Sequence, residues 1–303
     1  MMSVAAALLL LSAAGTLAAD WRYPTPGPDG SVGAPENWGG SCDQGRRQSP
    51  IDIAYAASVR GSYPAFIFDS YDSLPDSAYI VNNGHTVQIN LDSSSASSSV
   101  YGGGFRSKYV LEQLHFHWSS EHTIDDRRYA LEMHLVHRQS RYASVEQASS
   151  HKAGIAVLAV LFHVDEHPNE AIQLILNSTS PIKAKVDERQ PLRAPLHLND
   201  LLPKDRTVYF RYEGSLTTPV CAESVVWTVF PESLPISLGQ VQDFMTIHDA
   251  DNRELLANYR PVQPLNTRVL VLVSDTEVEA SGARRIASGM FAAVLLSLAI
   301  SLF

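Results

Sequence analysis

The stretch YVLEQLHFHW, residues 109–118, places two histidines on either side of one phenylalanine, and the related stretch YALEMHLVH follows at residues 129–137. Both runs are short, rich in aromatic and aliphatic residues, and bounded by turn-forming residues, which is typical of strands. Successive side chains of a strand point to opposite faces, so His115 and His117 share one face. In the second run His134 lies between Met133 and Leu135, so its side chain points to the face opposite theirs. An antiparallel pairing of the two runs would bring all three histidines together.

Three clustered imidazoles indicate a metal site, because buried imidazoles without a metal lose solvation with no compensating gain. Three neutral nitrogen ligands and no thiolate are typical of catalytic zinc, whereas structural zinc usually has four protein ligands, often cysteines. Gln113 and Glu132 each precede a histidine by two residues on the same strand face. A ligand histidine needs an acceptor for its other ring N–H, and we expect these two side chains to supply it.

The remaining pattern favours one mainly β domain with a few small peripheral helices. Apolar residues recur at helical spacing only in 168–178 and 237–247, the best helical candidates. Residues 93–104, SSSASSSVYGGG, are predicted to form a short low-complexity loop. The strand-like runs are 65–71, 79–91, 109–118, 129–137, 154–164, 207–215, 224–230 and 267–273.

Both ends of the chain are predicted to be targeting segments. Residues 1–19 form an apolar run that ends in small residues, as a secretory signal peptide does. The apolar run 290–303 is short for a membrane span, and the small residues 280–283 with a polar spacer precede it. That order resembles a glycolipid-anchor signal, so we expect a mature domain of residues 20–281, a removed segment 282–303, and a location on the extracellular face of the plasma membrane.

Charge and composition narrow the class of protein further. The 303 residues carry a net charge of −9 and contain no basic run, which argues against nucleic acid as the main partner. Cys42 and Cys221 are the only cysteines, and an even number in a secreted chain suggests a disulfide. The triplet NST at Asn177 is a glycosylation sequon.

Over nearly all of the chain between its terminal segments, the sequence resembles the α-class carbonic anhydrases. This resemblance implies a large, mostly antiparallel central sheet with small flanking helices. It also implies an enzyme that hydrates carbon dioxide reversibly to bicarbonate and a proton, through attack of a zinc-bound hydroxide. Seven ordered blocks carry the resemblance: RRQSPIDI (46–53), NNGHTVQI (82–89), QLHFHWSSEHTID (113–125), LEMHLVH (131–137), GSLTTP (214–219), VVWTVF (225–230) and YRPVQPLNTR (259–268).

Carried over block by block, the resemblance implies that His115, His117 and His134 bind Zn²⁺. Gln113 and Glu132 match the acceptors of two ligands, and a backbone carbonyl near Asn258 would serve the remaining one. Glu121 matches a carboxylate that is not a ligand but orients the hydroxyl of Thr217. His85 matches the shuttle that carries the proton out, a role that suits the ordinary pKa of histidine.

The resemblance also assigns a pocket and a disulfide. Cys42 and Cys221 would pair as in secreted and membrane-attached members of the family. An apolar wall suits carbon dioxide, which carries no charge, and Val136 lies on the same strand face as His134. The implied substrate pocket comprises Val136, Val157, Leu216, Thr218 and Trp227, and the implied polar cavity residues are Tyr23, Asn83 and Gln88, with Trp21 beside Tyr23 at the rim.

Two alternatives compete with this interpretation. HFHWSSE also satisfies H-x-H-x3-E, the pattern of cupins, in which Glu121 would be a ligand in an iron- or manganese-dependent oxygenase or isomerase. A catalytically inactive binding module at the cell surface is the other alternative. Cupins share only that one pattern, and neither a ligand histidine nor Thr217 is missing here, so we favour the enzyme. This sequence differs from the family pattern at one place: many family members have an insertion between HFHW and SEHT that this chain lacks.

Overall fold

The computed structural model describes residues 21–24, 35, 38–75, 77–91 and 98–274. The predicted signal peptide, residues 1–19, and the predicted anchor signal, residues 282–303, lie outside the described residues.

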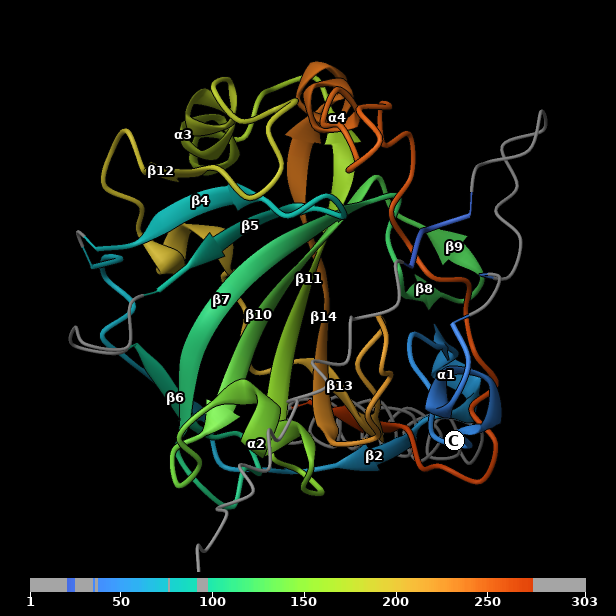
Figure 1. The fold of residues 1–303 in the computed structure, drawn as a ribbon. Coiled ribbons are helices and arrows are strands. Elements are labelled where there is room, and N and C mark those ends of the chain that lie inside the picture. Colours follow the sequence, from blue (N-terminus) through green and yellow to red (C-terminus); the bar gives the residue numbers. More distant parts are fainter. Residues whose placement is uncertain (1–20, 25–34, 36–37, 76, 92–97, 275–303) are drawn as a thin grey trace, which may run out of the picture.

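A large twisted sheet of twelve strands forms the body of the protein (Figure 1). Most neighbouring strands are antiparallel, and β11–β14 and β15–β2 are parallel pairs, so the predicted mainly β, mostly antiparallel sheet is confirmed. Along the sheet the order is β12 (Arg189–Pro191), β4 (Tyr79–Asn82), β5 (Val87–Asn90), β7 (Tyr109–Trp118), β10 (Leu131–Gln139), β11 (Ile155–Asp165), β14 (Val225–Ser237), β13 (Tyr209–Gly214), β15 (Val271–Val273) and β2 (Val59–Gly61), and β3 (Phe66–Asp69) and β6 (Ser99–Gly102) pair beside β7. A separate small sheet contains β1 (Asp52–Ile53), β8 (Thr123–Ile124) and β9 (Arg127–Arg128).

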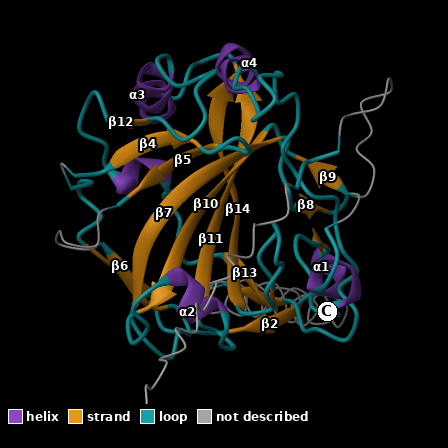
Figure 2. Cartoon of the chain, viewed as in Figure 1, coloured by secondary structure: helices purple, strands orange, loops and turns teal. Residues whose placement is uncertain are grey.

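The helices are short and lie around the sheet (Figure 2). They are α1 (Ser41–Gln44), α2 (Val145–Ser149), α3 (Glu170–Thr179) and α4 (Leu238–Met245), with 3₁₀ turns at Tyr55–Ala57 and Leu198–Leu201. Both predicted helices are confirmed as α3 and α4. The Asn169 side chain caps α3, and Ser237 with Gln240 forms a capping box on α4, so each start is fixed by polar side chains that accept the first free N–H groups.

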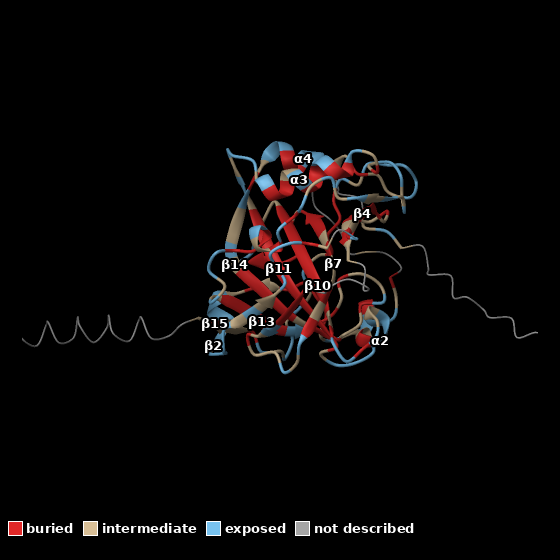
Figure 3. Cartoon of the chain, turned by 90° about the vertical axis from the view of Figure 1, so that its left-hand side faces the viewer, coloured by how far each residue is buried: buried red, intermediate tan, exposed pale blue. Residues whose placement is uncertain are grey.

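Buried residues concentrate on the long central strands (Figure 3). One face of β7 and β10 contributes Leu114, Phe116 and Leu135 to the larger apolar cluster, and all three are fully buried. The opposite face contributes Val136 to a second cluster that also contains Trp227. Both faces of these strands are therefore covered, which explains why the two runs contain so few exposed residues.

Two local predictions need correction. The run 79–91 is two strands, because the Asn83 side chain accepts hydrogen bonds from the backbone N–H groups of His85 and Thr86 and closes a turn. Residues 99–102 of the predicted loop form β6, paired with β3 and β7. Pairing to existing strands outweighs the weak strand preference of serine and glycine here. A left-handed turn follows at Gly103, whose φ is 52° and where a Cβ atom would overlap the ring of Phe66.

Candidate metal centre and active site

The three histidines predicted from the sequence come together on β7 and β10. The antiparallel register places His134 opposite His115 and Glu132 opposite His117. One ring nitrogen of each histidine lies within 4.8 Å of the corresponding atoms of the other two. His117 and His134 are each 1% exposed, whereas His115 is partly exposed.

Each histidine donates its other ring N–H to a fixed acceptor. His115 Nδ1 donates to Gln113 Oε1 at 2.8 Å, and His134 Nε2 donates to Glu132 Oε1 at 2.6 Å. The third acceptor is the backbone carbonyl of Asn258, which His117 Nδ1 contacts at 2.7 Å. These bonds fix the tautomers and leave His115 Nε2, His117 Nε2 and His134 Nδ1 as the three nitrogens with free lone pairs.

Burial favours the neutral, ligand form of these rings. It lowers the pKa of His115 well below its ordinary value, and the neighbouring imidazoles of His117 and His134 lower it further. Burial also lowers the pKa of His117, although the Glu121 carboxylate opposes the shift. Burial by itself would raise the pKa of Glu132, but His122 and His134 outweigh it and hold that pKa well below the ordinary range.

The donor set fits a metal ion. His117 Nε2 is buried and has no hydrogen-bond partner among the described residues, although a buried polar atom without a partner is costly. Three imidazole nitrogens satisfy the ligand preference of zinc, and both cysteines are in a disulfide. In the described part of the chain, no fourth side chain joins this group of three, which is the donor count of a catalytic rather than a structural zinc site.

A second buried cluster, His122, Glu132 and His134, is explained by hydrogen bonds alone. His122 Nδ1 donates to Glu132 Oε1 at 2.7 Å, and its Nε2 lies 2.7 Å from the Tyr212 hydroxyl. The backbone N–H of His122 donates to the other oxygen of Glu132. This network holds the Glu132 carboxylate in place beneath His134.

Glu121 reaches the site despite the short loop after β7. Its side chain is fully buried, Oε1 accepts a hydrogen bond from the backbone N–H of Arg260 at 2.9 Å, and Oε2 lies 3.5 Å from His117 Nε2. Thr217 is 5% exposed. Among the described residues no hydrogen bond joins Thr217 to Glu121, so that pairing stays a prediction.

Arg260 is a buried residue whose role the sequence reasoning missed. Its guanidinium donates to the carbonyls of Cys42 and Ser49 and to Gln48 Oε1, and its backbone fixes Glu121. It lies within the block YRPVQPLNTR, but the block by itself gave no sign of these contacts.

The predicted apolar pocket residues lie beside the histidines. Val157 on β11 pairs with Val136 on one side and with Trp227 on the other. These three side chains belong to one buried cluster, and the partly buried Leu216 packs against it. The ring centroid of Trp227 lies 4.8 Å from that of His134. An apolar wall therefore runs next to the metal centre.

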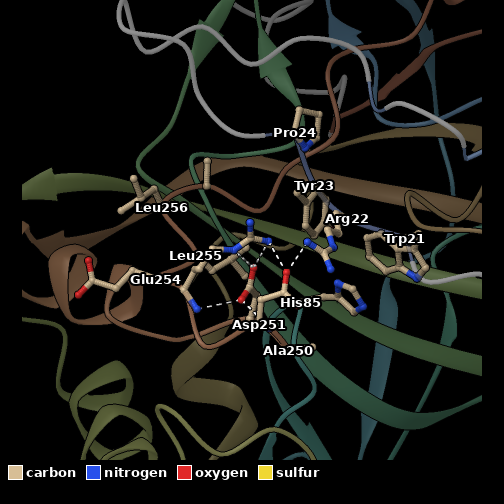
Figure 4. A pocket seen from close by; sticks show the side chains of 14 residues that line it. Trp21, Arg22, Tyr23, Pro24, His85, Ala250, Asp251, Glu254, Leu255 and Leu256 are labelled. Atoms are coloured by element: carbon tan, nitrogen blue, oxygen red, sulfur yellow. Dashed lines mark hydrogen bonds and ion pairs between the residues drawn. The ribbon is translucent and has the colours of Figure 1, made fainter.

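A cavity of about 340 Å³ lies beside His85 (Figure 4). The His85 ring stacks on Trp21, with 3.7 Å between ring centroids, and the Tyr23 ring lies 6.4 Å away. The side chain of Asn258 donates to the His85 carbonyl at 3.1 Å, and the backbone carbonyl of the same residue accepts from His117. His85 is thus tied to the residue that orients a candidate ligand.

Polar side chains connect the His85 turn with the strand that carries the first histidine. Asn83 Nδ2 donates to Gln88 Oε1 at 3.1 Å, and Gln88 on β5 pairs with His115 on β7. Burial raises the pKa of Tyr23 well above its ordinary value, and the nearby Glu121 carboxylate raises it further. The structure therefore brings the predicted polar residues together around the histidines.

The predicted disulfide between Cys42 and Cys221 is present. The N–H of Cys221 donates to the carbonyl of Thr218, and Gln48 donates to the carbonyl of Cys221. The bridge therefore anchors the segment 216–221, which carries both threonines, to the N-terminal part of the domain.

The fold and the three-histidine cluster define a protein with a candidate metal centre on the central strands of a large β-sheet. The family model of the eukaryotic-type carbonic anhydrases matches residues 33–274. The chain is 37% identical to carbonic anhydrase 4 of Oryctolagus cuniculus over 277 residues, covering 86% of this chain and 88% of the relative. It is 35% identical to carbonic anhydrase 15 of Mus musculus, covering 78% of each chain, and 36% identical to carbonic anhydrase 6 of Bos taurus, covering 75% and 72%.

The chain belongs to the eukaryotic-type carbonic anhydrase family. The predictions of an α-class carbonic anhydrase, and of an enzyme that hydrates carbon dioxide, are confirmed by these matches. The cupin and inactive-module alternatives are not favoured.

Two observations concern the predicted location of the protein. Asn177 is exposed on α3, and its side chain accepts a hydrogen bond from Gln173. Within the described residues, no helix combines the length and the apolar character needed to cross a bilayer.

Proposed function

We propose that His115, His117 and His134 bind one Zn²⁺ ion, and that the reversible hydration of carbon dioxide takes place beside it. The observation that carries this proposal is the set of three convergent ring nitrogens, each on a ring whose other nitrogen has a fixed acceptor. When bound, zinc supplies a Lewis acid that acidifies water, as is established for carbonic anhydrases.

Glu121 and Thr217 orient the nucleophile in this proposal. An ionised carboxylate can only accept hydrogen bonds, so Glu121 accepts the one hydrogen bond that the Thr217 hydroxyl can donate. The Thr217 oxygen then presents its lone pairs to the nucleophile and selects the direction of attack. Support comes from the buried Oε2 of Glu121, which has no hydrogen-bond partner among the described residues, and from the burial of Thr217.

The apolar wall receives the substrate. Carbon dioxide has no charge and no hydrogen-bond donor, so a pocket lined by aliphatic and aromatic side chains binds it without a desolvation cost. Val136, Val157 and Trp227 form this wall next to His134, and Leu216 packs against it. We assign Thr218, two residues after Leu216, to the same pocket.

His85 carries the released proton to solvent. Its imidazole lines a cavity, and histidine is the side chain best suited to relay protons at neutral pH. The Tyr23 ring lies beside it, and Asn83, in the same turn, donates a hydrogen bond to Gln88. These side chains are suited to order water along the path.

We also propose that the mature enzyme comprises residues 20–281 and is held at the extracellular face of the plasma membrane by a glycolipid anchor. The Cys42–Cys221 disulfide supports passage through an oxidising compartment. Asn177 is exposed, as glycosylation at its sequon requires.

The assignment of Glu121 and Thr217 is tested by Glu121→Gln and Thr217→Val, with Thr207→Val as a control at an exposed threonine outside the site. We expect both site variants to keep a full equivalent of zinc while the rate of carbon dioxide hydration falls by about 10²-fold, because an orienting hydrogen bond is lost. The control should match the parent protein. Loss of zinc from Glu121→Gln would mean that Glu121 is a ligand and would overturn the assignment.

A further inference from the structure

A buried arginine without a carboxylate partner lies on the other face of the sheet. Arg211 on β13 pairs with Thr228 on β14, whereas the next pair, Tyr212 with Trp227, faces the metal centre. The Arg211 side chain is 7% exposed. Within the described residues it has no ion pair, and its guanidinium donates to Thr228 Oγ1 at 2.9 Å.

Aromatic rings surround this guanidinium but do not neutralise it. Its central carbon lies 4.5 Å from the ring centroid of Phe105 and 5.3 Å from that of Tyr209. Such contacts stabilise a cation only weakly compared with the cost of leaving a buried charge unpaired. Burial accordingly lowers the pKa of Arg211 below its ordinary value.

Arg211 lines a cavity of about 710 Å³ whose rim is basic. Arg106, Arg141 and Lys152 also line it, and all three are exposed. The one carboxylate in the lining, Glu213, already pairs with Arg47 and with Lys152. The cavity therefore has a positive charge although the whole chain has a net charge of −9. A cleft lined by charge of one sign concentrates ions of the opposite sign.

A buried acceptor completes the lining. Gln139 at the end of β10 is 7% exposed, and its Oε1 has no hydrogen-bond partner among the described residues. The amide oxygen requires a donor. A ligand that satisfies both Arg211 and Gln139 must combine a negative charge with a hydrogen-bond donor, as an oxyanion with an O–H group does.

We propose that this cavity binds a small protonated oxyanion, of the class of hydrogen phosphate or bicarbonate, between Arg211 and Gln139. Arginine suits an oxyanion because its planar donors match two oxygens, and the exposed cations at the rim attract the ion. The cavity shares no lining residue with the proposed metal ligands, Glu121, Thr217 or His85, so the two sites are separate. The proposal does not depend on the proposed catalytic roles.

Isothermal titration calorimetry of the zinc-loaded protein with sodium phosphate, at constant ionic strength, tests this site. We expect one equivalent of phosphate to bind and the affinity to fall about tenfold or more in Arg211→Met, because charge-assisted hydrogen bonds are lost. Methionine preserves the apolar stem, so the variant should fold. Arg141→Gln with Lys152→Gln provides a second test at the exposed rim and should weaken binding more at low salt than at high salt.

Two controls separate this site from the metal centre and identify the anion. His134→Ala disrupts the metal centre, so it should keep the phosphate equivalent and allow bicarbonate to be titrated without turnover. Gln139→Leu should lower the affinity for hydrogen phosphate. It should leave the affinity for sulfate unchanged, because sulfate has no proton to donate at neutral pH. Binding that is lost in His134→Ala but kept in Arg211→Met would place the anion at the metal and overturn the proposal, as would the absence of any bound anion.

Discussion

At the scale of single residues, the candidate site depends on pairs of side chains. Strand alternation predicted that Gln113 and Glu132 would face the histidines, and both accept a ring N–H. The contact between His117 and the backbone carbonyl of Asn258, 141 residues away, was implied only by the resemblance. A contact between a side chain and a distant backbone group leaves no local pattern in the sequence. Arg260 was missed for the same reason.

Removing one of these hydrogen-bond acceptors should weaken zinc binding without destroying the fold. In Gln113→Ala the ring of His115 loses its orienting bond, so we expect zinc affinity to fall about 10- to 100-fold. Competition with a chelator measures the change. Gln190→Ala on β12, outside the site, is the matched control, and equal affinity in both variants would contradict this role of Gln113.

Acid should destabilise the protein in part through His137. This ring is fully buried, its Nδ1 donates to the carbonyl of Leu135, and burial lowers its pKa to about 4. The unfolded chain, with an ordinary pKa near 6.5, binds the proton more readily, so the stabilisation is complete above that value and is lost as the pH falls toward 4. Between pH 7 and 5 the loss is about 2 kcal/mol.

Urea unfolding at these two pH values, at equal zinc content, provides the measurement. His137→Gln should lose less stability on acidification than the parent protein. An identical loss in both proteins would show that His137 does not contribute to the pH dependence.

At the scale of elements, the sequence predicted the strands that carry the site better than their neighbours. Residues 109–118 were predicted as one strand and form β7 with those bounds. The parallel pairing of β11 with β14, and strand β6 within a run of serine and glycine, were not predicted. These features depend on which strands are already in place, which a local pattern does not contain.

The central strands should be the most sensitive elements to loss of volume. Leu135 on β10 is fully buried opposite Leu114, so Leu135→Ala leaves a cavity and should cost about 2–5 kcal/mol of unfolding free energy. Val164→Ala on β11, where the side chain is 53% exposed, should change it by less than about 0.5 kcal/mol. Denaturant titrations compare the two, and similar costs would contradict the assignment of the core.

At the scale of the whole molecule, one covalent link joins distant parts of the domain. The Cys42–Cys221 disulfide closes a loop across 179 residues and anchors the segment that carries Thr217. An even cysteine count in a secreted chain indicated pairing, and the structure confirms it. The terminal segments lie outside the described residues, so the predicted signal peptide and anchor stay predictions.

Removing the disulfide should affect both stability and activity. The double variant Cys42→Ser, Cys221→Ser should lose about 2–5 kcal/mol of stability. We also expect slower carbon dioxide hydration at temperatures where the variant is still folded, because Thr217 is less firmly held. Calorimetry and rate measurements on the same sample test both effects, and an unchanged rate would show that the bridge does not position Thr217.

In the proposed function, this chain hydrates carbon dioxide at a zinc ion held by His115, His117 and His134. Stopped-flow measurement of hydration by the purified protein, with zinc assayed on the same sample, tests it most directly. We expect fast hydration that is lost when a chelator removes zinc and restored when zinc is returned. Zinc-loaded protein without hydration, or hydration that survives complete removal of the metal, would contradict it.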